Sequence, residues 1–125
     1  MKKINKILLI NPRNRAVILE ESNSLNFGKM FPLGMGYIAA YLERKGYQVE
    51  IIDTIAEGFE NREEIDNDYI RIGISDKILI DKVCRSKPDI VGISCLFSTQ
   101  DKELAYMASL IKEHLPEVPI VVGGA

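Results

Sequence analysis

Four short apolar runs divide the chain, and none of them alternates cleanly with polar residues. They are rich in Ile, Val and Leu, and they cover Lys6–Ile10, Val49–Ile52, Asp89–Leu96 and Pro119–Val122. Strands that are buried on both faces have this composition, as in a parallel sheet. The pattern therefore predicts four strands of one parallel sheet.

Three helical patterns lie between these runs, each with apolar residues three and four positions apart on one face. The predicted inner positions are Met35, Ile38, Ala39 and Leu42, then Ile78, Leu79 and Val83, then Leu104, Met107, Ala108, Ile111 and Leu115. Ser75 suits the N-cap of the second helix. Gly46, Pro88 and Pro116 stand where the three helices should end.

The predicted order β-α-β-α-β-α-β indicates an α/β fold, with a doubly wound parallel sheet in a Rossmann-like (flavodoxin-like) three-layer sandwich. Two long connections interrupt it, residues 12–32 and the acidic residues 54–74, and we expect the second to be a solvated surface excursion. The sequence stops at Gly123-Gly124-Ala125, where a covering helix should follow. We therefore expect residues 1–125 to be one domain, truncated after the fourth strand, from a longer protein.

The composition is that of an ordinary globular domain, with 46% hydrophobic and 27% charged residues and a net charge of −2. A nucleic-acid or anionic membrane partner would favour a basic surface, so neither is expected. No apolar run approaches the roughly 20 residues of a membrane span, and we expect a cytoplasmic protein. Cys84 and Cys95 have no CxxC spacing, which argues against a disulfide framework or a zinc site.

A ligand is expected at the carboxyl ends of the strands, where open α/β sheets bind their ligands. These ends are Asn11-Pro12, Asp53-Thr54, Ser94-Cys95-Leu96 and Gly123-Gly124. The two glycines would let a bulky group approach the backbone, and the Ser94 hydroxyl can donate and accept hydrogen bonds. No catalytic pair is indicated, because the single histidine, His114, is expected on the surface.

A nucleotide ligand is the alternative. Gly34-x-Gly36-x-x-Ala39 opens a helix, and Asp53 ends the next strand, as in a dinucleotide fingerprint. However, that fingerprint directly follows the first strand, and here more than twenty residues separate Ile10 from Gly34. A nucleotide- or flavin-binding domain is therefore less favoured, and a ligand-free docking or structural domain of this fold stays open.

Several phrases resemble the N-terminal cobalamin-binding domain of cobalamin-dependent radical-SAM proteins. Ser94-x-Leu96, followed by Gly123-Gly124, is similar to the Ser-x-Leu and Gly-Gly elements of cobalamin-binding domains. The run from Pro32 to Leu42 and the phrase Ile10-Asn11-Pro12 resemble the radical-SAM branch, which includes the anaerobic magnesium-protoporphyrin IX monomethyl ester cyclase type. The resemblance covers nearly the whole chain.

The resemblance implies a set of cofactor-binding residues and no catalytic residue. Asn11, Pro12, Phe31, Leu33 and Gly34 would line the corrin face, Ser94 of Ser-x-Leu96 would bond the benzimidazole end of the tail, and Gly123 and Gly124 would give the tail room. The tail would enter the sheet between the first and third predicted strands.

The resemblance also implies the state of the cofactor. Methionine-synthase-type domains ligate cobalt with the histidine of a DxHxxG motif, but here Lys29 and Phe31 occupy its Asp and His positions. The implied state is base-off cobalamin without a protein histidine ligand. A C-terminal radical-SAM domain would add a [4Fe–4S] cluster and S-adenosylmethionine, and it would carry out methyl transfer or ring formation. The CxxxCxxC motif for that cluster is absent here, so this part can at most bind cobalamin, and we expect no catalysis from it alone.

Overall fold

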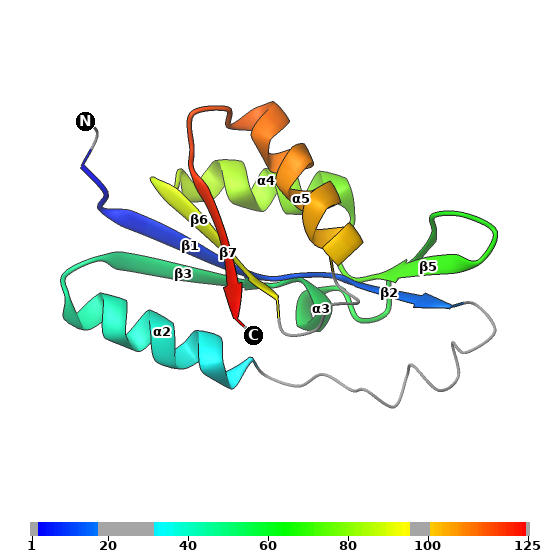
Figure 1. Cartoon of the computed structure of the whole chain (residues 1–125), viewed down its shortest axis with the longest axis horizontal. Helices are drawn as coiled ribbons and strands as arrows, with labels where there is room; N and C mark the ends of the chain where they lie inside the picture. The colour runs from blue at the N-terminus through cyan, green and yellow to red at the C-terminus, as the bar shows by residue number, and fades with distance from the viewer. Residues whose placement is uncertain (1–2, 18–31, 96–100, 125) are drawn as a thin grey trace.

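The structure, a computed structural model, describes residues 3–17, 32–95 and 101–124 (Figure 1). Its main sheet has four parallel strands in the order β3-β1-β6-β7, which cover Gln48–Asp53, Lys6–Asn11, Ile90–Cys95 and Ile120–Gly124. β3, the second strand of this sheet along the chain, lies on one side of β1, and the later strands β6 and β7 lie on the other. This is the flavodoxin-like order, and it confirms the predicted doubly wound α/β fold.

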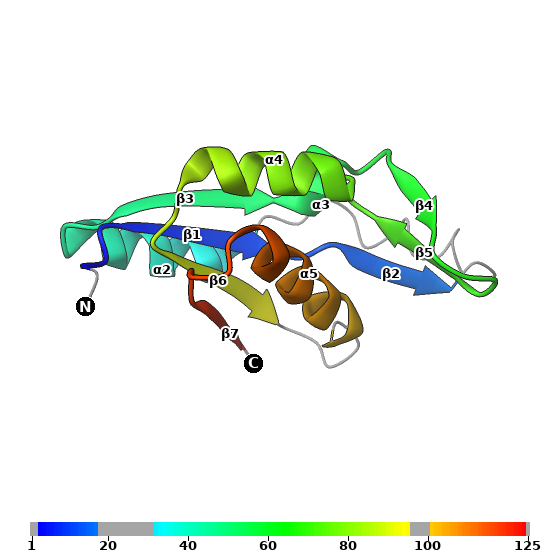
Figure 2. The same ribbon diagram turned by 90° about the horizontal axis from the view of Figure 1, so that it is seen from above.

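Helices cover both faces of this sheet (Figure 2). On one face, α2 (Leu33–Arg44) packs Met35 and Ala39 against Ile7 and Leu9 of β1. On the other face lie α4 (Asp76–Ser86) and α5 (Asp101–His114). This second layer holds the larger core, which consists of Leu8, Ile10, Ile52, Ile74, Leu79, Val83, Val91, Ile93, Leu104, Met107 and Ile111. Alternate side chains of β1 therefore pack into two separate cores, one on each face of the sheet, as expected for a three-layer sandwich.

The predicted helix ends are confirmed by their local geometry. The Ser75 hydroxyl accepts a hydrogen bond from the Ile78 amide at 3.2 Å, which caps α4. Gly46 follows α2 with φ +97°, a backbone conformation that side chains with a Cβ disfavour. Two predicted core positions are wrong, because Ile38 and Ile78 are 54% and 46% exposed. Both lie at the border of their helix's apolar stripe, beside the positions that are buried.

The two long connections form secondary structure that the sequence pattern did not predict. They contribute a small antiparallel sheet in the order β2-β5-β4, which covers Asn14–Val17, Tyr69–Ile72 and Arg62–Glu64, and a short helix, α3 (Thr54–Glu57). Ala16, Ile70 and Ile72 make a core of their own between its strands. The expectation of a solvated excursion over residues 54–74 is therefore wrong. Within the described ranges, no helix has both the length and the apolarity needed to cross a membrane.

Candidate functional site

A row of four residues crosses the main sheet at the carboxyl ends of its strands. Asn11 pairs with Asp53 on β3, and Ser94 of β6 pairs with Gly123 of β7. Ile10 pairs with Ile93, so the next residues, Asn11 and Ser94, lie side by side. We call Asp53, Asn11, Ser94 and Gly123 the strand-end row. The row brings together a carboxylate, an amide, a hydroxyl and a position with no side chain.

The whole row faces the α2 side of the sheet. Side chains alternate along a strand, and Ile7 and Leu9 pack against α2, so Asn11 points the same way. Ile93 packs into the opposite core, which turns Ser94 toward the α2 side. The start of α2 also lies at this edge, because the helix runs back along β1 toward the start of β3 (Figure 1).

Beside α2, the sheet presents small residues and an open surface. Over β6 and β7, this face carries Gly92, Ser94, Val121 and Gly123, and Val121 is 54% exposed. A Cβ placed on Gly123 would meet no atom within 4 Å. A Cβ on Gly92 would meet the Leu9 side chain at 3.0 Å, so that position is already packed. The strand-end row therefore borders a stretch of sheet with small residues, where a ligand could approach the backbone at Gly123.

Hydrogen bonds fix the β3 and β1 part of the row. The Asn11 amide donates from Nδ2 to Asp53 Oδ1 at 3.1 Å, and the Thr54 hydroxyl donates to the Asn11 carbonyl oxygen at 2.7 Å. Asp53 Oδ1 also accepts from the Ala56 amide at 3.1 Å and caps α3. The Glu57 carboxylate accepts from the Asp53 amide at 3.1 Å. These bonds hold the two strand tips in one geometry.

The remaining predicted site residues are distributed around this edge. Pro12 is fully buried behind Asn11, and Gly124 pairs with Cys95 one step beyond the row. Leu33 is 63% exposed at the start of α2, and a Cβ on Gly34 would meet no atom within 4 Å. Phe31 and Leu96 lie outside the described residues. The structure thus gathers Asn11, Ser94, Gly123 and Gly124 at one edge and leaves their ligand contacts as predictions.

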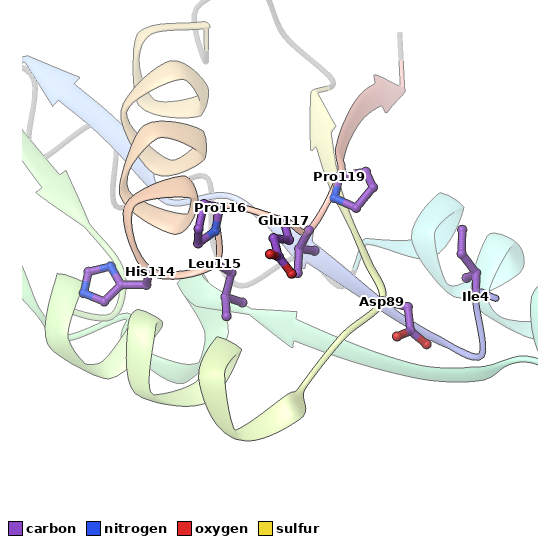
Figure 3. Close-up of a pocket in the computed structure, with 8 residues that line it drawn as sticks. Ile4, Asp89, His114, Leu115, Pro116, Glu117 and Pro119 are labelled. Carbon is purple, nitrogen blue, oxygen red and sulfur yellow. The ribbon is translucent and has the colours of Figure 1, made fainter. Parts of the chain in front are cut away.

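A pocket at the opposite, amino edge of the sheet shares no residue with this site (Figure 3). Its lining includes Ile4, Asp89, His114 and Pro119. The Asp89 carboxylate accepts from the Asn5 and Lys6 amides at 2.8 and 2.9 Å, so it anchors the start of β1. His114 is exposed, as predicted, with its Nδ1 atom 3.0 Å from the Leu110 carbonyl oxygen.

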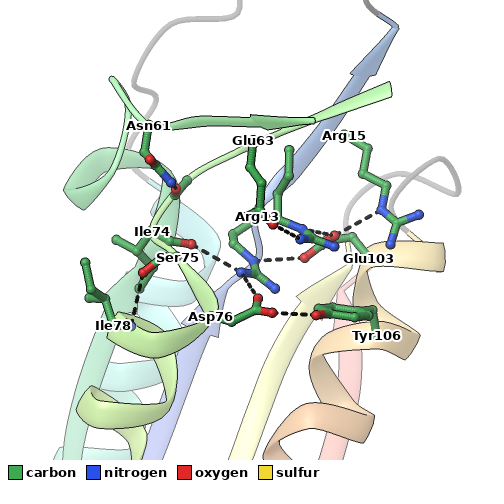
Figure 4. A network of polar contacts seen from close by, with 12 residues as sticks. Arg13, Arg15, Asn61, Glu63, Ile74, Ser75, Asp76, Ile78, Glu103 and Tyr106 are labelled. Carbon is green, nitrogen blue, oxygen red and sulfur yellow. Dashed lines mark hydrogen bonds and ion pairs between the residues drawn. The ribbon is translucent and has the colours of Figure 1, made fainter. Parts of the chain in front are cut away.

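Sequence reasoning missed a buried charged network beyond the end of β1 (Figure 4). Glu103, in the first turn of α5, is 1% exposed. Its carboxylate accepts from the Nε atoms of three arginines, Arg13 at 2.9 Å, Arg15 at 3.0 Å and Arg71 at 2.9 Å. We call these four residues with Asp76 and Tyr106 the arginine network. It joins β2 and β5 of the small sheet to the start of α5.

Asp76 extends the network to the start of α4. It accepts from Arg13 Nη1 at 2.6 Å and from the Tyr106 hydroxyl at 2.5 Å. Burial raises the pKa of Asp76, but the hydrogen bonds from Tyr106 and Arg13 outweigh it and hold that pKa below its usual value. The bond to Asp76 raises the pKa of Tyr106. Burial alone would lower the pKa of Arg71, yet its bond to Glu103 raises it.

The arginine network is linked to the strand-end row through the backbone that follows Asn11. Arg13 is fully buried and follows Asn11 by two residues, with the buried Pro12 between them. Its Nη1 also donates to the Ile74 carbonyl oxygen at 3.2 Å, and its Nη2 has no partner among the described residues. A charged residue two positions after the strand tip was the one local signal. Its partner Glu103 lies 90 residues away, beyond the reach of any sequence pattern.

Comparison with known proteins adds the family. The model of the B12 binding domain matches residues 27–125. The chain is 36% identical, over 126 aligned residues and 99% of its length, to the cytidylyl-2-hydroxyethylphosphonate methyltransferase of Streptomyces wedmorensis. It spans about a quarter (23%) of the length of that relative. With its sheet order and its match over most of the sequence, the chain belongs to the B12-binding domain family.

Proposed function

We propose that this chain is the cobalamin-binding module of a B12-dependent methyltransferase, with the corrin seated at the strand-end row. The observation that carries this proposal is the row itself, with its open small-residue face, in a chain that matches the B12-binding family over residues 27–125. Cobalamin supplies, when bound, a cobalt centre that carries a methyl group. The residues of this chain bind and orient it.

The residues at this edge fit the two parts of the cofactor. A corrin ring is broad and flat, with amides around its rim, and Asn11 and Ser94 offer polar groups for such amides. The nucleotide tail needs a path beside the sheet, and Ser94 and Gly123 leave one that no described helix covers. Ser94 would bond the benzimidazole end of the tail, and Gly123 and Gly124 would let it lie against the backbone.

We infer that cobalt receives no histidine from this part of the chain. Residues 1–113 contain no histidine, and His114 lies at the far end of α5 from the strand-end row. A base-off cofactor without a protein imidazole is consistent with this composition. The corrin alone would then hold the cobalt, and the protein would contact the edge of the corrin ring and the nucleotide tail of the cofactor.

Between the two candidate reactions of the whole protein, we favour methyl transfer. The relative aligned over nearly this entire chain is named as a methyltransferase, and its substrate name belongs to that protein alone. A C-terminal radical-SAM domain with a [4Fe–4S] cluster and S-adenosylmethionine is the partner that the sequence resemblance implies. The two cysteines described here lie in α4 and β6, without the CxxxCxxC spacing, so a cluster would need cysteines from elsewhere. The cyclase type is the alternative reaction.

One feature of the strand-end row disfavours the nucleotide alternative. In a dinucleotide site, the acid at the end of the second strand accepts hydrogen bonds from a ribose. Here Asp53 Oδ1 already accepts from Asn11 Nδ2 and from the Ala56 amide. One of the two carboxylate oxygens is therefore engaged in holding the strand tips, which leaves Oδ2 alone for a ribose.

The test uses the chain loaded with hydroxocobalamin, followed by gel filtration and a visible spectrum. We expect corrin absorbance to co-elute with the protein. Gly123→Leu should reduce retention at least about tenfold by filling the tail path, because the added side chain meets open space in the free protein. Val122→Leu is the matched control, since Val122 lies on the same strand, faces the other side and is 50% exposed. No retention by the wild-type chain, or retention of FMN or NAD instead, would contradict the proposal.

A further inference from the structure

The Asn11 side chain is held in one orientation by a partner that can only accept hydrogen bonds. Asn11 is 9% exposed, and its Nδ2 donates to the Asp53 carboxylate at 3.1 Å. An ionised carboxylate has no proton to donate, so the end of the amide that faces Asp53 must be the NH2 group. The flip of this amide is therefore fixed by chemistry.

The fixed flip determines what Asn11 presents to a ligand. The oxygen of a planar amide points away from its nitrogen, so Oδ1 is turned away from β3 and Asp53. Among the residues that the structure describes, none donates a hydrogen bond to Oδ1. The strand-end row thus offers a carbonyl acceptor that has no donor within residues 3–17, 32–95 and 101–124.

Asp53 is itself too constrained to release the amide. The same Oδ1 atom caps α3 through the Ala56 amide at 3.1 Å, and the Asp53 backbone amide donates to Glu57. Turning the carboxylate away from Asn11 would therefore cost the cap as well. Asp53 acts as a positioning residue, and Asn11 is the group that would touch the ligand.

We propose that Asp53 fixes the Asn11 amide with its carbonyl oxygen toward the ligand, so that the site favours a corrinoid whose nearby rim group is a primary amide over one with a carboxylate there. A primary amide donates N–H to the waiting oxygen. A carboxylate has no proton to donate and would leave the oxygen unpaired while facing the Asp53 charge. The inference rests on the proposed cobalamin function and names the feature of the ligand that this row selects.

The experiment compares hydroxocobalamin with its separated monocarboxylic acid derivatives, in each of which one rim amide is hydrolysed. Dissociation constants come from visible-absorbance titration of the chain. We expect at least one derivative to bind about tenfold more weakly than hydroxocobalamin, the loss typical of one hydrogen bond. Equal affinity for all of them would overturn the inference and leave the cobalamin function intact. If no corrinoid bound at all, the proposed function would fail first.

Two substitutions at Asp53 separate orientation from charge. Asp53→Asn keeps an oxygen that can both cap α3 and accept from Asn11, so the preference for the amide should persist. Asp53→Ser keeps a cap but replaces the obligate acceptor with a hydroxyl that can also donate, so the preference should fall to about twofold or less. If Asp53→Asn abolished the preference as fully as Asp53→Ser, charge alone would explain it and the inference would be wrong.

A control and a ligand-free readout complete the test. Glu57→Gln removes a neighbouring negative charge that contacts Asp53 only through its backbone amide and otherwise pairs with Lys82, so the preference should stay unchanged. Without ligand, the Asn11 side-chain NH2 protons should exchange slowly by NMR in the wild type and in Asp53→Asn, and at least about tenfold faster in Asp53→Ser. Unchanged exchange in Asp53→Ser would show that Asp53 does not hold the amide, even if that variant bound corrinoids poorly.

Discussion

Replacing Glu103 with glutamine tests whether the arginine network stabilises the domain. The substitution keeps the shape of the side chain and removes its negative charge. In the wild type, this 1% exposed carboxylate accepts three charge-assisted hydrogen bonds, from Arg13, Arg15 and Arg71, at 2.9–3.0 Å. Glutamine retains one oxygen, and its NH2 group would face guanidinium groups that cannot accept a hydrogen bond.

The expected loss of stability follows from this geometry. Hydrogen bonds to charged groups contribute about 1.5–3 kcal/mol each, and at least one of the three is lost outright. Removing one partner of a buried ion pair typically costs about 3–5 kcal/mol, because the remaining charge stays buried. We therefore expect Glu103→Gln to lower the free energy of unfolding by about 4 kcal/mol. That is a large share of the roughly 5–15 kcal/mol of a typical domain.

Urea denaturation followed by far-UV circular dichroism measures this change, with comparison of the m-values to confirm that the same transition is observed. The matched control is Glu63→Gln, because Glu63 lies 3.6 Å from Arg71 Nη1 and its side chain is 46% exposed. An exposed ion pair contributes about 1 kcal/mol or less, so the control should stay close to the wild type. A loss below about 1 kcal/mol for Glu103→Gln, or equal losses for both variants, would refute the stabilising role of the network.

Two further predictions concern α4. The pKa of Asp76 is lowered in the folded state, so its ionised form adds stability that is present above about pH 4 and is lost as pH falls through the folded-state value. Asp76→Asn should therefore lose stability at pH 7 and show a flatter decline between pH 5 and pH 2 in urea titrations; an unchanged acid profile would contradict this. Ser75→Ala removes the hydroxyl that accepts from Ile78 and should cost about 1 kcal/mol in thermal or urea unfolding, whereas Ser75→Asp should retain most of the stability.

The main sheet was predictable because its information is local. The apolar runs at β1, β3, β6 and β7 stand out from their neighbours, and Ser75 and Gly46 mark helix ends by chemistry that acts within four residues. The small sheet was missed because β5 places Ile70 and Ile72 in an acidic stretch and pairs them with β2, more than fifty residues away. Its apolar pattern is only four residues long and gains meaning from that distant partner.

Only part of the candidate site was predictable from the sequence. Ser94, Gly123 and Asn11 could be singled out because strand ends in such sheets meet at one edge. The role of Asp53 could not, because it depends on the register that sets this residue opposite Asn11. Glu103 could not be singled out from the sequence, because an acid in the first turn of a helix is commonplace. Only the fold shows that three arginines converge on it.

The position of Arg13 limits how far this domain can be shortened. The tripeptide Asn11-Pro12-Arg13 runs without a break from the strand-end row into the arginine network. A minimal version that deleted the small sheet would remove Arg15 and Arg71 and expose Arg13 and Glu103 to water. The strand tip would then lose the support on its inner side, and with it the fixed geometry at Asn11. The small sheet therefore supports the strand-end row, and grafting this domain onto another protein would require carrying both long connections with it.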